Sequence, residues 1–449
     1  MSRMARLAAT SDAVIYLPGI MGSELVNASG DVVWGLKPSL VFRQAAFGNI
    51  LDRLALRPGD GISASRPLRF PAALPMLSSM EPYAALEERL KTVVVAPEAV
   101  RPFAYDWRKS IADAAEKLGP VAREHLAQWR SRWNTLPAED KRGLPEPGLT
   151  LVAHSMGGLV ASYFAAFVDG GELVRRVITL GTPFNGSLNA VDALATGKQF
   201  PFGAFAESLR AAVRMLPGVY ELVARWECIT DGESRRRLTP DDLEDIGADR
   251  ELAEAAMATI GKMRSAFGDD STRKPPVRCL VGTTQATRQT VRIRDGVPEF
   301  FEHIDGRDRR GDGTVFLDAA RPPNLVPSYV PQAHGALAKA HEAVEFIAAV
   351  LTEEKLDKYQ APSGIGLRVP EIVTVNQTFV VEILDGNAGL MCQLIDAEDN
   401  RLITVTPSKV RDGSVQADFK APKPGLFRVA VSGGGFSPVE ALVGAMTTT

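Results

Sequence analysis

A serine lies where one run of apolar residues gives way to another. Leu149–His154 reads as a strand, and Ser155 is followed at once by small residues, Met156-Gly157-Gly158. A strand that turns sharply into a helix at a serine with small neighbours is typical of a nucleophile elbow. The usual pattern is G-x-S-x-G, and Ala153 stands here at its first position. We predict that Ser155 is a nucleophile; the alternative is a strand-to-helix junction at which Ser155 only caps the helix.

A nucleophilic serine needs partners that activate it. A base must take the hydroxyl proton as the serine attacks, and a carboxylate must hold that base in the right tautomer. In α/β sheets with such an elbow the order along the chain is serine, acid, histidine, each in a loop after a strand. Asp312, between Gly311 and Gly313, and His334, in a loop before a helix, meet this order. The sequence predicts a triad of Ser155, Asp312 and His334.

Other acids and histidines compete for these roles. Asp305 and Asp308 lie in a charged stretch that is typical of a solvated loop, whereas the glycines beside Asp312 let its carboxylate turn back under the sheet edge. The remaining histidines lie too early in the chain, beside the nucleophile, or in a predicted helix; they are His125, His154, His303 and His341. We expect structural roles for these.

The tetrahedral intermediate of acyl transfer requires two backbone N–H donors. One is expected from Met156, directly after Ser155. The second is expected from the loop Pro18-Gly19-Ile20 after the apolar strand Ala13–Leu17, and we choose Ile20. The alternative for this loop is a tight turn with no catalytic role.

The elements that position these residues alternate between strands and helices. Predicted strands are Ala13–Leu17, Thr92–Val95, Arg101–Tyr105, Leu149–His154, Leu173–Gly181 and Val277–Gly282. Helical patterns separate them, including one that runs to Trp133 with Asp106 as its expected N-cap. This alternation predicts an α/β fold with a mostly parallel sheet covered on both faces.

An insertion and a hairpin follow the elbow. Residues 188–274 carry helical patterns with little strand character, which predicts an all-helical cap over the site. Its apolar side chains could line an acyl pocket or form the core of the cap itself; they include Phe200, Phe202, Phe205, Leu209, Met215, Leu216 and Tyr220. A hairpin is predicted from Thr290–Arg294 and Glu299–His303 around the turn Asp295-Gly296.

The chain changes character around residues 352–363, where the composition becomes polar. Short β-rich runs separated by turn residues then predict about seven strands, as in an immunoglobulin-like β-sandwich. We therefore predict two domains, 1–352 with the α/β-hydrolase fold and 363–449 with the sandwich. The second has no cluster of catalytic residue types, so we expect adhesion, oligomerisation or surface docking, which includes binding of a protein partner.

Composition excludes some classes of function. The 449 residues carry 51 basic and 54 acidic side chains, so the net charge of −3 gives no reason to expect nucleic acid as a partner. The three cysteines, Cys228, Cys279 and Cys392, lie far apart and suggest neither zinc nor disulfides. With no signal peptide or membrane-spanning stretch evident, a cytoplasmic location is expected. The predicted chemistry requires no metal or organic cofactor.

Taken together, the motifs resemble the lecithin:cholesterol acyltransferase family of α/β-hydrolases, which includes lysosomal phospholipase and phospholipid:diacylglycerol acyltransferases. The matching pieces occur in family order across about residues 13–351: Leu17–Leu25, Tyr105–Arg108, Ala153–Gly158, Thr179–Ser187, Leu216–Leu222 and Gly311–Val315. The resemblance implies a triad on Ser155, Asp312 and His334, with an oxyanion donor on Ile20. It also implies action on acyl esters of lipids, by hydrolysis or acyl transfer.

The predicted function is a serine hydrolase or acyltransferase of lipid esters that works through an acyl-enzyme intermediate, with peripheral contact to a membrane. One alternative is a short-chain carboxylesterase or thioesterase. Another is a binding protein without turnover, built on a hydrolase scaffold.

Overall fold

The centre of the molecule is a parallel sheet. The computed structural model describes residues 9–37, 53–74, 78–169, 171–195, 203–268, 276–322, 324–356 and 364–447. In this part of the chain the strand order is β15-β12-β9-β8-β1-β7, and every pairing between neighbours is parallel. The strands are β1 (Ala13–Leu17), β7 (Val100–Pro102), β8 (Leu149–His154), β9 (Val174–Leu180), β12 (Val277–Gly282) and β15 (Ser328–Val330).

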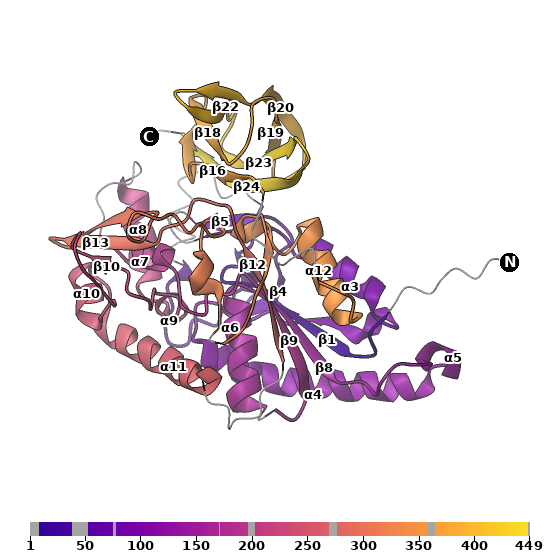
Figure 1. The fold of residues 1–449 in the computed structure, drawn as a ribbon. Helices are drawn as coiled ribbons and strands as arrows, with labels where there is room; N and C mark the ends of the chain where they lie inside the picture. Colours follow the sequence, from indigo (N-terminus) through magenta and orange to yellow (C-terminus); the bar gives the residue numbers. More distant parts are fainter. Residues whose placement is uncertain are drawn as a thin grey trace.

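Helices cover both faces of this sheet (Figure 1). α3 (Ala84–Val93) and α12 (His341–Leu351) pack together on one face, and α4 (Ile111–Thr135) and α6 (Met156–Tyr163) on the other. α6 continues as one π-helical turn, Phe164–Val168. Every position of β1 and β8 is buried, which explains why both strands are continuous apolar runs rather than alternating patterns. The predicted α/β-hydrolase fold with a mostly parallel sheet is confirmed.

Two details between β1 and β8 differ from the prediction. The run Thr92–Val95 is not a strand, because α3 continues to Val93; a short apolar run cannot be assigned to strand or helix by periodicity alone. The N-cap of α4 is Ser110, whose hydroxyl accepts a hydrogen bond from the Asp113 amide. Asp106, predicted to be that cap, instead forms an ion pair with a buried arginine, Arg108.

The insertion after β9 is not purely helical. Its helices are α7 (Leu188–Leu194), α8 (Gly203–Val213), α9 (Pro217–Tyr220), α10 (Pro240–Asp245) and α11 (Arg250–Gly268). It also holds β10 (Ile229–Thr230) and β11 (Arg235–Arg236), which join the predicted hairpin, found as β13 (Thr290–Arg294) and β14 (Val297–Phe301), in the order β11-β10-β13-β14. A strand of two residues has no period to recognise, so the expectation of an all-helical insertion was wrong.

The apolar residues singled out in this insertion have different surroundings. Leu209, Leu216 and Tyr220 are buried in the main core, whereas Met215 is 44% exposed. Phe200 and Phe202 lie outside the described residues, as does the side chain of Phe205. The described members therefore support a core role rather than an acyl pocket.

Smaller elements flank the sheet. Strands β2 (Ser23–Val26), β3 (Val32–Trp34) and β4 (Ser63–Pro67) form one antiparallel sheet, and β5 (Ala72–Leu74) pairs with β6 (Ser78–Met80). Short helices are η1 (Pro97–Ala99), α5 (Ala138–Lys141), η3 (Leu317–Ala320) and η4 (His334–Ala336). Within the described ranges, no helix combines the length and the apolar character needed to cross a membrane.

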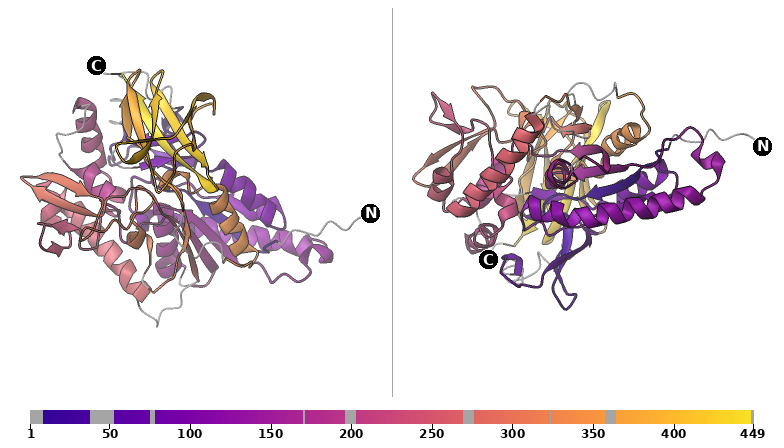
Figure 2. Two further views of the ribbon diagram at one scale, coloured as in Figure 1. Left: turned by 45° about the horizontal axis from the view of Figure 1, so that its top comes forward. Right: turned by 90° about the horizontal axis from the view of Figure 1, so that it is seen from below.

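The C-terminal part consists of two β-sheets, β16-β18-β22-β21 and β17-β24-β23-β19-β20, drawn in yellow and gold in Figures 1 and 2. Their strands are β16 (Gly366–Arg368), β17 (Ile372–Thr374), β18 (Thr378–Leu384), β19 (Met391–Asp396), β20 (Leu402–Pro407), β21 (Lys409–Arg411), β22 (Ser414–Lys420), β23 (Gly425–Gly433) and β24 (Phe436–Met446). Both sheets share one apolar core, which contains only residues of this segment. We call this part the sandwich. Its described strands exceed the predicted seven because β16, β17 and β21 have only three residues each.

Candidate active site

Ser155 lies at a strained turn between β8 and α6. Its backbone has φ 53° and ψ −128°, a region that residues with side chains rarely occupy. Its hydroxyl makes no capping hydrogen bond to α6, so the structure does not support the capping alternative. Gly157 allows the turn to approach the loop after β1, because a Cβ at this position would lie 2.4 Å from the carbonyl oxygen of Pro18. The lack of space for a Cβ thus explains why the motif has a glycine at position 157.

The structure brings Ser155, His334 and Asp312 together although they are far apart in the sequence. The Nε2 atom of His334 lies 2.8 Å from Ser155 Oγ, and its Nδ1 atom lies 2.7 Å from Asp312 Oδ2. A carboxylate only accepts hydrogen bonds, so Nδ1 carries the proton in the neutral ring and Nε2 accepts from the serine hydroxyl. This is the arrangement needed for a base that takes the proton of an attacking serine.

Backbone amides fix the carboxylate of Asp312. Its Oδ1 atom accepts hydrogen bonds from the N–H groups of Thr314 and Val315, at 2.9 and 2.7 Å, which leaves Oδ2 for His334. The amide of His334 in turn donates to the carbonyl of Asp312 at 2.8 Å. The two loops are therefore joined by a backbone hydrogen bond as well as by the contact between their side chains.

The competing residues lie elsewhere. Asp305 pairs with Arg235, and Asp308 pairs with Arg310, both in partly exposed loops. His125 is buried on α4 and contacts the carbonyl of Ala99. The others are His303, which follows β14, and His341, which is exposed at the first position of α12. None of these contacts Ser155.

The two residues predicted as oxyanion donors flank the serine. Met156 is the first residue of α6, where backbone N–H groups have no acceptor within the helix. The loop of Ile20 passes close to the nucleophile, since a Cβ on Gly19 would lie 2.8 Å from the Cβ of Ser155. The amide of Gly19 already donates to the hydroxyl of Tyr83 at 2.8 Å. That leaves Ile20 as the next backbone donor of the loop.

A second histidine supports the site, and sequence reasoning missed its contacts. His154 Nε2 lies 2.9 Å from the carbonyl oxygen of His334, so Nε2 donates and Nδ1 is free to accept. Tyr83 donates its hydroxyl proton to that Nδ1 at 2.9 Å. Burial, and next the proximity of His334, lower the pKa of His154 to about 3, so its ring stays neutral. No spacing in the sequence signals a contact between Tyr83 and His154.

These bonds form one continuous chain from the predicted oxyanion loop to His334, the predicted base. It runs from the Gly19 amide to the Tyr83 hydroxyl, then through the ring of His154 to the backbone of His334. Burial raises the pKa of Tyr83, so the phenol keeps the proton that it donates. The chain fixes the loop and the base relative to each other.

The sandwich contacts both loops that carry Asp312 and His334. The Gln332 side chain, two residues before His334, donates to the carbonyl of Pro438 and accepts from the amide of Glu440. The Gln285 side chain accepts from the amide of Leu367 at 2.8 Å, while the backbone of Gln285 bonds to Gly311 beside Asp312. Sequence reasoning did not anticipate that the C-terminal segment lies against the site.

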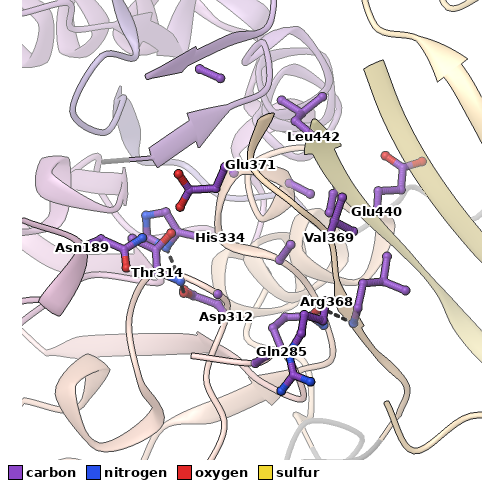
Figure 3. Close-up of a pocket in the computed structure, with 18 of the residues that line it drawn as sticks. Asn189, Gln285, Asp312, Thr314, His334, Arg368, Val369, Glu371, Glu440 and Leu442 are labelled. Carbon is purple, nitrogen blue, oxygen red and sulfur yellow. Dashed lines mark hydrogen bonds and ion pairs between the residues drawn. The ribbon is translucent and has the colours of Figure 1, made fainter. Parts of the chain in front are cut away.

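A cavity of about 360 Å³ lies between these two parts of the molecule. Figure 3 shows Asp312 and His334 on one side of it and Val369 and Leu442 of the sandwich on another. Ser155 is not among the residues that line the cavity. Within the described residues, no group of histidine, cysteine or acidic side chains could hold a metal ion.

Comparisons with a family model and with solved structures both give matches. Residues 75–233 match the family model of lecithin:cholesterol acyltransferase. A chain in the crystal structure of the Tle4–Tli4 complex is 14% identical, with 78% of this chain and 99% of that chain covered and a TM-score of 0.51. The Bacillus licheniformis lipase BlEst2 in its propeptide form is 12% identical, with 96% and 93% covered and a TM-score of 0.38. A search of curated proteins gives no match.

The family match covers the elbow, and the structural likeness supports the sheet and its helices. On these findings residues 75–233 are similar to the lecithin:cholesterol acyltransferase family, and the chain has an α/β-hydrolase fold.

Proposed function

We propose that this chain is a serine-dependent hydrolase or acyltransferase that cleaves acyl esters, with lipid esters as the substrate class. The single observation that carries the proposal is the contact of Ser155 Oγ with His334 Nε2, whose other ring nitrogen bonds to Asp312. This geometry suits a nucleophile, a general base and an orienting acid. It supports a catalytic protein over a binding protein on a hydrolase scaffold.

The reaction follows from this geometry. Ser155 Oγ attacks the ester carbonyl as His334 Nε2 takes its proton, and Asp312 stabilises the imidazolium. The amides of Ile20 and Met156 hold the oxyanion. The bond between the carbonyl carbon and the alcohol oxygen then breaks, and His334 returns the proton to the departing alcohol. Water or a second alcohol releases the acyl group by the reverse steps.

An active-site probe tests the nucleophile. A fluorophosphonate should label the wild-type protein and leave Ser155→Ala unlabelled, because only an activated serine reacts at a useful rate. Ser162→Ala is the matched control, since Ser162 is also a buried serine of the segment around α6. Equal labelling of wild type and Ser155→Ala would refute the assignment, and loss of labelling in the control would point to a folding defect.

Several finer expectations stay predictions. They are the division into domains at 1–352 and 363–449, the cytoplasmic location, the peripheral contact with a membrane, and the binding of a protein partner by the sandwich. The described cysteines are free thiols and buried, which is compatible with a reducing compartment.

A further inference from the structure

Two buried glutamines join the sandwich to the loops of the proposed triad. Gln332 lies two residues before His334 and is 3% exposed, and Gln285 lies after the end of β12 and is 2% exposed. An amide side chain is rarely buried unless its polar atoms find partners, because an unpaired polar group is costly away from water. The partners of these two side chains therefore indicate their role.

Gln332 links the His334 loop to β24. Its Oε1 atom accepts from the amides of Glu440 and Ala333, both at 3.1 Å, and its Nε2 atom donates to the carbonyl of Pro438 at 3.2 Å. The oxygen thus faces two donors and the nitrogen faces an acceptor, which is the orientation that satisfies the amide. Since Ala333 directly precedes His334, one side chain bonds both the sandwich and the neighbour of the proposed base.

Gln285 makes the corresponding link for the Asp312 loop. Its Oε1 atom accepts from the amide of Leu367 in β16 at 2.8 Å, and its Nε2 atom donates to the hydroxyl of Thr284 at 3.0 Å. Its backbone exchanges two hydrogen bonds with Gly311, at 2.9 and 3.2 Å. Gly311 directly precedes Asp312, so Gln285 bonds the sandwich through its side chain and the Asp312 loop through its backbone.

The backbone packs closely around both links. A Cβ on Gly366, at the start of β16, would lie 1.9 Å from the carbonyl oxygen of Thr284. A Cβ on Gly282, the last residue of β12, would lie 2.5 Å from the Cβ of Asp312 and 2.8 Å from the carbonyl oxygen of Gln332. The sandwich therefore lies directly on the segment that bonds the Asp312 loop, and the end of β12 lies against both loops.

We infer that Gln285 and Gln332 are positioning residues for the proposed reaction, and that the sandwich acts through them on the geometry of the triad. The inference rests on the proposed serine mechanism and gives the sandwich a part in it. The bonds that carry the inference end on backbone atoms and on Thr284, so both glutamines act through the loops. A shift of about 1 Å in a catalytic group can cost about a hundredfold in rate, so loops that carry Asp312 and His334 need such support.

Methionine substitutions test the inference, because methionine has nearly the length of glutamine but cannot replace its hydrogen bonds. In Gln332→Met and in Gln285→Met, kcat for the soluble ester p-nitrophenyl butyrate should fall about fivefold or more, whereas KM should change less than about threefold. This split is expected because the two loops place the base and its carboxylate. Titration with a fluorophosphonate counts the reactive serines in each sample, so kcat is expressed per folded active site.

Val381→Ala is the matched control. Val381 is fully buried in the core of the sandwich, so its truncation destabilises the sandwich but removes none of the hydrogen bonds to the loops. Its kcat per reactive serine should stay within about twofold of the wild-type value. Gln332→Asn and Gln285→Asn carry the test where a methionine variant does not fold, because they keep the amide but are too short to bond both sides, and the same split is expected.

Three results would overturn the inference. They are a fall in kcat of less than about fivefold at either glutamine, a change in KM as large as the change in kcat, or an equal fall in kcat in Val381→Ala. If a fluorophosphonate labels wild-type Ser155 in these samples, such a result refutes the positioning role and leaves the serine mechanism intact. If the wild-type serine is not labelled, the serine mechanism itself fails, and the inference fails with it.

Discussion

Arg428 of the sandwich and Glu81 of the α/β-hydrolase part form a bidentate ion pair, with Nε to Oε1 at 2.6 Å and Nη2 to Oε2 at 2.8 Å. Both side chains are almost fully buried, at 7% and 2% exposure. The amide of Glu81 also donates to the carbonyl of Gly335, the residue after His334. The pair thus joins the sandwich to the loop that carries His334.

Breaking this pair should cost both stability and rate. Arg428→Ala leaves the buried carboxylate of Glu81 with Lys339 as its remaining cation, and unfolding free energy should fall by about 3 kcal/mol. The rate constant kcat should fall more than KM changes, because the His334 loop loses support. Denaturant unfolding and steady-state kinetics measure both. Arg411→Ala, which breaks an exposed pair with Asp418, is the control and should change stability by less than about 1 kcal/mol.

The tyrosine between the oxyanion loop and His154 gives a second prediction. Tyr83→Phe removes the acceptor of the Gly19 amide and the donor to His154 at once. Stability should fall by about 1 to 3 kcal/mol, and kcat should fall about tenfold or more, as the loop moves from the serine. Tyr163→Phe serves as control, because Tyr163 lies at the far end of α6 from Ser155. Unchanged kcat in Tyr83→Phe would show that the loop needs no such anchor.

The close approach at the elbow predicts a strong effect from one methyl group. Gly157→Ala places a Cβ about 2.4 Å from the Pro18 carbonyl, so the loop of Ile20 must shift. We expect kcat to fall by about a hundredfold with a smaller change in KM. Gly261→Ala is the control, because a Cβ there meets no atom within 4 Å. A variant of Gly157 with normal kcat would argue against this loop as an oxyanion donor.

A buried carboxyl outside the triad predicts a pH effect on stability. Burial raises the pKa of Glu221 to about 7, and its Oε2 atom accepts from the Ile111 amide. Between the ordinary value of 4.5 and about 7 the folded state keeps a proton that the unfolded chain has lost, so stability falls as the pH rises through this window.

The substitution Glu221→Gln should remove that part of the pH dependence. The loss of unfolding free energy between pH 5 and pH 8 should shrink by about 1 to 3 kcal/mol, measured by urea titration at both values. Glu116→Gln, at an exposed position of α4, should leave the slope as it is. The same slope in wild type and Glu221→Gln would contradict the assignment.

Local patterns predicted the inner strands β1 and β8 well, because both strands are buried on both faces and read as apolar runs. Asp295 and Gly296 both have positive φ, as the turn residues of a two-residue hairpin loop should. The patterns failed where the run was short. Thr92–Val95 carries strand-forming residues, yet α3 and its packing determine the conformation there.

The order of motifs predicted which side chains the fold brings together at Ser155, because strand ends of a parallel sheet meet at one edge. It could not predict contacts that depend on tertiary packing. Tyr83 reaches His154, and Arg428 reaches Glu81, across long stretches of chain with no shared pattern. Such contacts form only when whole elements pack against each other, so no local sequence pattern predicts them.

The position of β24 within its sheet has a consequence for biosynthesis. This strand lies between β17 and β23, and it supplies Ala441 and Leu442 to the cavity beside the triad. When the ribosome has synthesised Ser155, Asp312 and His334, it has therefore not yet synthesised all the residues that line the cavity. The cavity beside Asp312 and His334 can therefore form only after these late residues have left the exit tunnel.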